Sequence, residues 1–251
     1  MKKLSESERA CWAFIEENID SIQHLTMIEV ARKSYTSLAT VGRTIRKMGY
    51  DSYFELKLAS KNSVNEDHKE SGGFSFEVNI IIDESKNEVL QTLNRLCVED
   101  IETAVELLLH SKIISIFANE GSSLVARDAE KKLRLSGKQV NIYENYECMN
   151  YYSKIISRDS LILCISLNGE NPEIISAVTI AKSRQIKILT ITSNFESSLA
   201  LMSDVCLVGY SFRRKEVDLG LDVDSRLCLS LLIRLLVDCL AIRKRFGKIR
   251  D

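Results

Sequence analysis

The amino-acid sequence predicts a small all-helical N-terminal domain followed by a larger α/β domain in which helices flank a parallel sheet. Two observations carry this prediction. Residues 1–60 repeat apolar side chains at helical intervals, whereas beyond residue 110 short apolar runs alternate with longer amphipathic segments. Between these regions lies a polar stretch, residues 61–75, which contains Gly72 and Gly73 and reads as a linker. We therefore expect two domains, 1–75 with the linker included and 76–251.

The composition is typical of a soluble globular protein. Of the 251 residues, 45% are hydrophobic and 27% charged, and the formal net charge is −1, which argues against a disordered polyelectrolyte. Arg234 and Asp238 interrupt the most apolar stretch, so no run reaches the roughly 18 residues that a membrane span requires. Two lysines near the N-terminus have no apolar segment behind them, so we expect no signal peptide and a cytoplasmic location.

Cysteine and histidine give no indication of a metal site or cofactor. The seven cysteines form no CxxC pair, and several lie inside apolar runs, so we expect reduced core residues. The three histidines, His24, His68 and His110, are far apart in the sequence. A zinc site and a Ser-His-Asp triad are therefore not expected, and no cofactor is predicted.

The N-terminal domain has the pattern of a helix-turn-helix. Helices are expected over 5–19, 26–33 and 37–47, and the gap between the last two is three residues long. In the third helix Leu38, Val41, Ile45 and Met48 share one face, which we expect to be buried. The opposite stripe is expected to face outward and contains Thr40, Arg43, Thr44 and Lys47.

This third helix is the candidate DNA-recognition helix. Ser37 is a suitable N-cap, and short polar and cationic side chains can reach base edges and phosphates in a major groove. Residues 26–60 carry six basic and three acidic side chains, whereas residues 1–25 carry three and five. The alternative is an ordinary solvated helix face. The candidate DNA-binding residues are Ser37, Ala39, Thr40, Arg43, Thr44, Arg46 and Lys47.

A resemblance to a known family strengthens the DNA-binding interpretation. The order Glu29, Ala31, Ser34, Ser37, Ala39, Thr40, Arg43, Lys47, Gly49 and Tyr50, followed by FELK, resembles the N-terminal domain of the RpiR family of bacterial transcriptional regulators. Two positions depart from the family pattern. Tyr35 stands where the turn usually has glycine, and Gly42 stands mid-helix where an apolar residue is usual.

The second domain is expected to alternate strands and helices. Helices are predicted over 87–109, 122–135, 147–156, 172–184, 197–202 and 224–244, and strands over 113–118, 140–143, 161–165, 188–191 and 205–207. Such alternation implies right-handed crossovers and a parallel sheet with helices on both faces. Ligands of these sheets bind beyond the carboxyl ends of the strands.

Polar loops follow three of the predicted strands. The first contains Ser122 and Ser123; the second contains Ser166, Asn168, Gly169 and Asn171, with Pro172 suited to the first helical position; and the third contributes Thr192, Ser193 and Ser197. Hydroxyls and free backbone N–H groups at helix N-termini bind anions such as phosphate. Each loop taken alone is more simply explained as caps and turns. The candidate ligand-binding residues are Ser122, Ser123, Ser166, Asn168, Gly169 and Asn171.

The order of these loops resembles the SIS (sugar isomerase) domain, a phosphosugar-binding fold, over about residues 107–208. Ser122, Ser166, Gly169 and Glu173 match the family motifs, whereas Ala118, Glu120, Asn168 and Asn171 depart from them. An RpiR-like head followed by a SIS-like body is the full architecture of the family. The resemblance implies a regulator whose SIS domain senses a sugar phosphate and mediates oligomerisation, as a homodimer or homotetramer.

Three functions therefore stay open at this point. The first is a DNA-binding regulator that responds to a phosphorylated sugar or related anionic metabolite and has double-stranded operator DNA as partner. The second is a SIS-type sugar phosphate isomerase, although no histidine lies in a candidate ligand loop. The third is an interaction protein without DNA binding. A variant of the first is a regulator whose ligand site has become a dimerisation scaffold. We expect the first, with no catalytic residues and no membrane partner.

Overall fold

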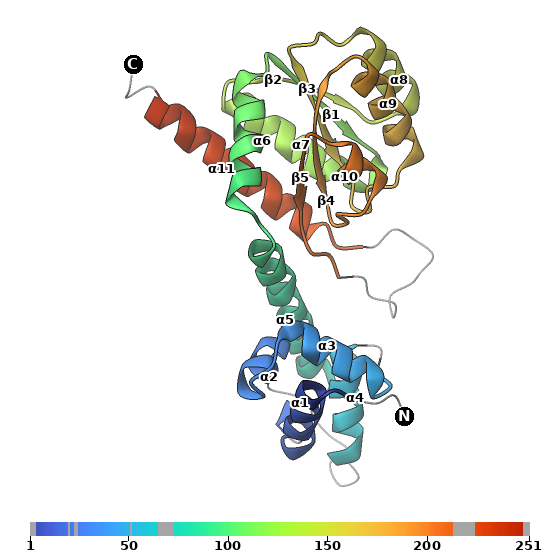
Figure 1. Ribbon diagram of the computed structural model, residues 1–251, viewed down its shortest axis with the longest axis vertical. Helices are drawn as coiled ribbons and strands as arrows, with labels where there is room; N and C mark the ends of the chain where they lie inside the picture. Colours follow the sequence, from blue (N-terminus) through green and yellow to red (C-terminus); the bar gives the residue numbers. More distant parts are fainter. Residues whose placement is uncertain are drawn as a thin grey trace. The chain divides into compact units, whose positions relative to one another are not determined.

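The computed structural model describes residues 4–19, 21–22, 25–50, 52–64, 73–212 and 224–247. The chain forms two compact units, Met1–Asn87 and Glu88–Asp251 (Figure 1). Helix α5, Gly73–Asn94, belongs to both units, because it begins in the first and ends in the second. The domain boundary predicted between residues 75 and 76 falls within this helix. The end of the DNA-binding domain therefore stays a prediction.

The first unit consists of helices α1 (Glu6–Glu17), α2 (Met27–Lys33), α3 (Leu38–Lys47) and α4 (Tyr53–Val64), followed by the first part of α5. The starts of α1 and α2 are fixed by capping boxes, in which Ser5 pairs with Glu8 and Thr26 with Glu29. Apolar side chains at helical spacing then meet in one core, formed by Cys11, Ile15, Ile22, Val30, Ala31, Val41, Ile45 and Leu56.

Two predictions about the middle of the chain were wrong. Residues 61–64 end α4 and residues 73–75 begin α5, so the polar stretch expected to be a linker is helical at both ends. Residues 65–72 lie outside the described residues. The single helix expected over 87–109 is two helices, because α5 ends at Asn94 and α6 (Val98–His110) begins after the extended residue Cys97.

The second unit is built on a parallel sheet with strand order β2-β1-β3-β4-β5 (Figure 1). The strands are β1 (Ile113–Ala118), β2 (Gln139–Tyr143), β3 (Ser160–Ile165), β4 (Lys187–Thr192) and β5 (Val205–Val208). Each pair of neighbouring strands is parallel, with Ile116 beside Ile142 and Leu163, and Leu163 beside Leu189. The carboxyl ends of the strands therefore share one edge of the sheet, as the predicted fold class requires.

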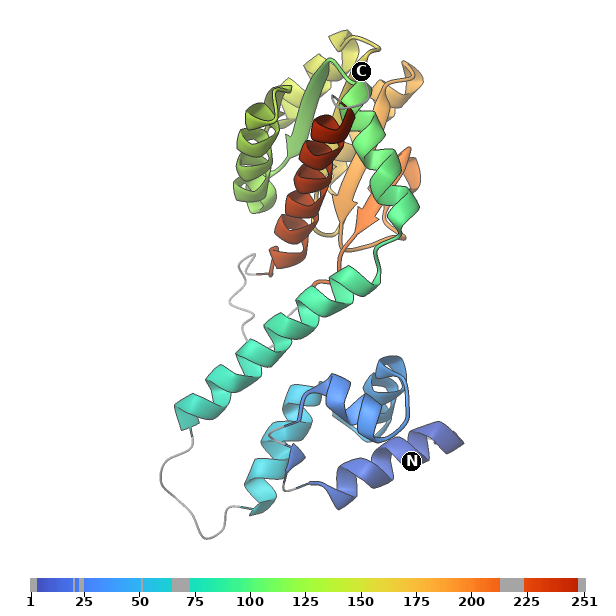
Figure 2. The same cartoon turned by 90° about the vertical axis from the view of Figure 1, so that its left-hand side faces the viewer.

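Helices cover both faces of this sheet, which confirms the predicted α/β fold class. Alternate strand residues such as Ile116 and Leu163 pack against α6, α7 (Ser123–Leu135) and α11 (Leu227–Gly247) on one face. The intervening residues, such as Phe117 and Ile162, pack against α8 (Tyr146–Ile155), α9 (Pro172–Ser183) and α10 (Ser198–Met202) on the other. Figure 2 shows α6 and α11 lying on the same side of the strands. Strands buried on both faces explain the continuous apolar runs of the sequence.

Within the described residues no helix is both long and apolar enough to cross a lipid bilayer. All seven cysteines are free thiols. Cys11, Cys164 and Cys228 are buried, but Cys97 is exposed, so the expectation of core cysteines was wrong for that residue. Its position at the break between α5 and α6 is the reason, because the chain there runs at the surface.

Candidate functional site

Two backbone hydrogen bonds close the turn between α2 and α3. Helix α2 ends with Ser34 as its C-cap, and Tyr35 follows in the left-handed region at φ 54°. The Tyr35 N–H donates to the Arg32 carbonyl at 3.3 Å, and the Thr36 N–H donates to the Ala31 carbonyl at 2.9 Å. These two bonds form a Schellman motif, which normally has glycine at the left-handed position. The turn therefore keeps its shape even though a tyrosine occupies that position.

Helix α3 begins immediately after this turn. The Ser37 hydroxyl accepts a hydrogen bond from the Thr40 N–H at 3.1 Å, which is the predicted N-cap. Arg43, Arg46 and Ala39 are exposed on one arc of the helix, and Ser37 is exposed at its start. The arc is thus open to solvent and carries two arginines one helical turn apart.

The predicted outward position of two candidate residues was wrong. Thr40 is 5% exposed and Thr44 fully buried, and the Thr44 hydroxyl donates to the Thr40 carbonyl at 2.9 Å. Helix α3 packs against α1, α2 and α4, so its buried face is wider than its apolar stripe. Threonine tolerates this burial because its hydroxyl is satisfied within the helix. Both side chains are buried in the folded first unit.

Lys47 flanks the exposed arc and pairs with an acidic residue of α1. Its Nζ lies 2.7 Å from Glu8 Oε2, and Glu8 itself is buried. The Lys47 ammonium and the Ser5 N–H lower the pKa of Glu8 from 4.5 to about 2. Lys47 is therefore first a structural partner of α1, and any phosphate contact would compete with this ion pair.

In the second unit, the loop after β1 places the two predicted serines differently. Ser122 is buried and its N–H donates to the Asn119 carbonyl at 2.9 Å, whereas Ser123 begins α7. The Ser123 hydroxyl donates to the carboxylate of Glu144, which directly follows β2. Arg127 Nη2 reaches the same carboxylate at 2.6 Å. Ser123 is thus occupied by a neighbouring anion in this structure.

The loop after β3 is closely bound to the loop after β4. The Leu167 carbonyl accepts hydrogen bonds from the Thr192 hydroxyl at 3.0 Å, the Ser193 hydroxyl at 2.7 Å and the Ser193 N–H at 2.8 Å. Ser166 is buried, and its N–H donates to the Ile191 carbonyl at 3.1 Å. The structure therefore brings Ser166 together with the polar residues that follow β4.

Gly169 makes this close approach possible. Its φ is 68°, and a Cβ built there would lie 2.2 Å from Ser197 Oγ and 3.1 Å from Thr192 Oγ1. Its carbonyl accepts from the Leu199 N–H at 3.2 Å. Any larger residue would push the two loops apart, because neither the conformation nor the space accepts a side chain.

Three polar side chains of the same loop form its turns and caps. Asn168 accepts from the Glu170 N–H at 3.2 Å, and Asn171 caps α9 by accepting from the Ile174 N–H at 3.0 Å. The Glu170 carboxylate crosses to the next loop and accepts from both the N–H and the hydroxyl of Ser198 at 2.7 Å. These bonds lower the pKa of Glu170, so the loop holds a carboxylate. Among the described residues, the amide nitrogens of Asn168 and Asn171 donate no hydrogen bond.

The segment after β5 connects this edge of the sheet to α5. The Gly209 N–H donates to the Thr192 carbonyl at 2.9 Å, and Arg95 Nη1 lies 3.4 Å from the Gly209 carbonyl. The Tyr210 N–H donates to the buried Thr92 hydroxyl at 3.0 Å. The C-terminal part of α5 is therefore hydrogen-bonded to the segment that closes the candidate ligand edge.

The predicted ligand residues thus come together only in part. Ser166 and Gly169 lie with Thr192, Ser193 and Ser197, whereas Ser123 pairs with Glu144. The sequence interpretation missed Glu144, Arg127 and Ser198 as members of this edge; the position of Glu144 directly after a strand was the available signal. The part of the chain that the structure describes contains no cluster of three or more metal-ligating side chains. His110 is exposed and ends α6, next to the amino end of β1, away from the carboxyl edge.

Comparison with known proteins identifies both units. A model described as the helix-turn-helix domain of the rpiR family matches residues 1–67, and a SIS domain model matches residues 107–208. The fold and the two sites therefore define a protein that joins a helix-turn-helix head to a SIS domain. The chain therefore combines an rpiR-type helix-turn-helix domain with a SIS domain, the domain order that the sequence motifs predicted.

Several known proteins are similar to this chain at low identity. A bifunctional protein glk from Burkholderia orbicola is 27% identical over 232 residues, which cover 89% of this chain but only 36% of that protein. An uncharacterized HTH-type transcriptional regulator from Clostridium perfringens is 23% identical over 215 residues, 80% of this chain and 76% of that protein. The Vibrio vulnificus NanR protein complexed with ManNAc-6P matches 100% of this chain and 91% of its own, with a TM-score of 0.61 at 23% identity.

Proposed function

We propose that this protein is a DNA-binding transcriptional regulator whose SIS domain senses a phosphorylated sugar or a related anionic metabolite. The observation that carries the DNA-binding part is the exposed arc of α3, in which Arg43 and Arg46 stand one turn apart beside Ala39. Guanidinium groups recognise guanine edges and phosphates through paired hydrogen bonds. The proposed contact set is Ser37, Ala39, Arg43, Arg46 and, at its flank, Lys47.

Replacing Arg43 with alanine tests this surface. If Arg43 contacts a base, the Arg43→Ala variant loses about 1 to 3 kcal/mol of specific binding and discriminates less between a selected duplex and a scrambled one. The measurement is fluorescence anisotropy with a duplex enriched from a random library by the wild-type protein. Arg9→Ala is the matched control, because it removes an exposed arginine from α1. Equal affinity of Arg43→Ala and the wild type would contradict the assignment.

The ligand part of the proposal rests on the edge formed by the loops after β1, β3 and β4. Ser166, Asn168, Gly169 and Asn171 offer hydroxyl, amide and backbone donors at the start of α9, an arrangement suited to a phosphate group. The V. vulnificus relative, whose structure holds a sugar phosphate, supports this ligand class. Glu144 and Glu170 lie near the same loops, and they favour a ligand that combines an anionic group with neutral hydroxyls.

A thermal-shift screen against sugar phosphates and the corresponding free sugars tests the ligand. A ligand present at about 100 times its Kd adds roughly 2.7 kcal/mol to the free energy of unfolding, which raises the Tm of the second unit. The shift requires the phosphate and is lost in Ser166→Ala. Thr179→Ala, on the exposed part of α9, is the control. A shift that survives in Ser166→Ala would place the ligand elsewhere, and silence across the panel would favour the alternative of a dimerisation scaffold.

We propose no isomerase activity for this chain. Isomerisation requires a base and a ring-opening acid beside the sugar. Two carboxylates at this edge are already bonded within the protein: Glu144 to Ser123 and Arg127, and Glu170 to Ser198. A regulator instead needs a ligand with different affinities for two arrangements of the protein, and this difference alone shifts operator binding.

A further inference from the structure

Tyr35 is an exposed aromatic residue in a backbone conformation that tyrosine disfavours. Its φ is 54°, and its side chain is 96% exposed. A left-handed conformation is costly for a residue with a Cβ, and glycine occupies it without this cost. The Schellman bonds of the turn involve only backbone atoms, so glycine would preserve them. The fold of the head therefore does not explain the tyrosine.

The Tyr35 side chain has no internal function among the residues that the structure describes. It makes no hydrogen bond and no ring contact, unlike Tyr53, whose hydroxyl donates to the Leu25 carbonyl, and Tyr50, which stacks on Trp12. An exposed aromatic side chain at a strained position points to a function outside the folded head.

The neighbours of Tyr35 identify the chemistry of that partner. Arg32 and Lys33, in the last turn of α2, are exposed, and the exposed start of α3 follows at Ser37. In helix-turn-helix proteins the first helix of the motif crosses the DNA backbone and the second enters the major groove. The turn between them lies where the sugar-phosphate backbone passes. A tyrosine hydroxyl is among the groups that donate hydrogen bonds to phosphate oxygens.

We propose that the Tyr35 hydroxyl donates a hydrogen bond to a phosphate of the DNA backbone and so fixes the position of α3 in the groove. This inference rests on the proposed DNA-binding function and adds a residue to it. It predicts opposite effects of one substitution on two properties. Tyr35→Gly relieves the backbone strain and stabilises the free head, yet it weakens DNA binding.

The experiment compares the wild type, Tyr35→Gly and Tyr35→Phe as full-length proteins, with a duplex that the wild type enriches from a random library. Tyr35→Gly is expected to raise the Tm of the head by up to about 5 °C. Both variants are expected to bind the duplex at least about tenfold more weakly, because each loses a hydrogen bond to a charged group. The slope of log K against log salt stays unchanged, since tyrosine is neutral. Arg32→Ala, by contrast, lowers that slope.

Three results would overturn the proposal. Equal DNA affinity of Tyr35→Gly and the wild type would exclude any contact, and full affinity of Tyr35→Phe would exclude the hydroxyl. A wild-type protein that enriches no duplex would overturn both this inference and the proposed function. Weaker DNA binding by both variants, with a head that is at least as stable as the wild type in Tyr35→Gly, supports it.

Discussion

At the scale of single residues, the pair between Glu8 and Lys47 makes the stability of the head depend on pH. The pKa of Glu8 is lowered from 4.5 to about 2 by Lys47 and the Ser5 N–H. A carboxyl group with a lowered folded-state pKa contributes stability above its unfolded pKa, and that contribution disappears as the pH falls toward the folded value. The stability of the head is therefore expected to fall between about pH 4.5 and pH 2.

Glu8→Gln tests this dependence. The variant is expected to be less stable than the wild type at pH 7, because it loses the ion pair and the charged cap, and to lose less stability on acidification. The Tm of both proteins, followed by circular dichroism from pH 7 to pH 2, gives the comparison. Glu6→Gln, an exposed residue of the same helical turn, is the control. Parallel pH profiles for Glu8→Gln and the wild type would show that the pair does not contribute.

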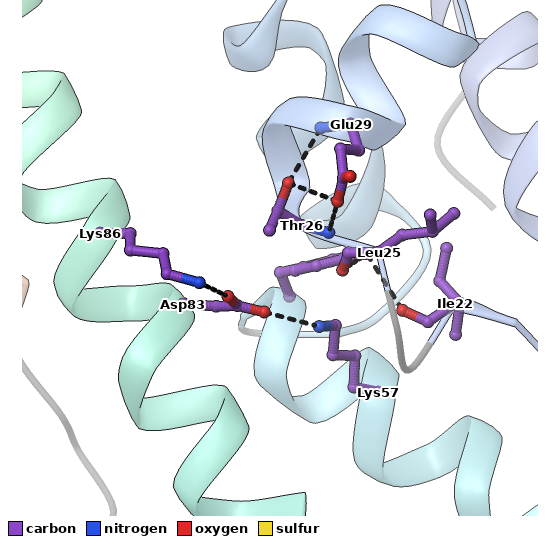
Figure 3. A network of polar contacts seen from close by, with 8 residues as sticks. Ile22, Leu25, Thr26, Glu29, Lys57, Asp83 and Lys86 are labelled. Carbon is purple, nitrogen blue, oxygen red and sulfur yellow. Dashed lines mark hydrogen bonds and ion pairs between the residues drawn. The ribbon is translucent and has the colours of Figure 1, made fainter.

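At the scale of elements, an ion pair between the buried Lys57 amine of α4 and Asp83 of α5 links the two helices. The Lys57 side chain is 3% exposed, and its Nζ lies 3.7 Å from Asp83 Oδ2, while Lys86 Nζ lies 3.2 Å from Asp83 Oδ1 (Figure 3). Burial lowers the pKa of Lys57, whereas Asp83 opposes this shift. Removing one partner of a buried pair leaves the other charge uncompensated, so the pair fixes α5 against the head.

Asp83→Asn is therefore expected to lower the free energy of unfolding of the first unit by about 1 to 3 kcal/mol. Lys57→Met in the same background is expected to recover part of this loss, because the unpaired ammonium is then absent. Urea denaturation of the wild type, the two single variants Asp83→Asn and Lys57→Met, and the double variant measures the cycle. Lys86→Met, which removes the exposed partner of Asp83, is expected to change stability by no more than about 0.5 kcal/mol. Additive effects of the Asp83 and Lys57 substitutions would refute the coupling.

Most secondary-structure elements of the second unit could be predicted from the sequence. All five strands and the covering helices follow from apolar runs and amphipathic spacing, because burial on two faces leaves a strong signal. The predicted linker failed for the opposite reason: apart from Val64 and Phe74, residues 61–64 and 73–75 are polar or small, yet they belong to helices. Thr40 and Thr44 illustrate a second limit. Polarity placed them outside, but tertiary packing on three sides decides their burial.

The candidate site was predictable in outline and not in its contacts. Loops after strands must share one edge, so Ser166, Gly169 and the residues after β4 could be grouped from the sequence. The occupation of Ser123 by Glu144 could not be predicted, because the two lie 21 residues apart and meet only through the pairing of β1 with β2. The bond from Glu170 to Ser198 depends in the same way on tertiary structure.

At the scale of the whole molecule, we expect a symmetric homodimer. Readers of the helix-turn-helix type commonly bind two half-sites about 34 Å apart, which requires two recognition helices. Light scattering on the purified protein is expected to give twice the mass of one chain or a multiple of it, and duplexes with two correctly spaced half-sites are expected to bind more tightly than those with one. A monomer that binds both duplexes equally would contradict dimeric operator binding.

Helix α11 also has a consequence for how the protein is made. It follows every strand in the sequence, yet its residues Cys228, Leu229, Leu232, Ile233, Leu236 and Leu240 complete the core on one face of the sheet. A nascent chain on the ribosome therefore carries the five described strands with one apolar face covered only by α6 and α7 until α11 has emerged. The helices α1 to α4 precede the described strands in the sequence, so they can pack while the rest of the chain is translated. We expect chaperones and proteases of the cell to bind the chain chiefly in the interval before α11 closes that face.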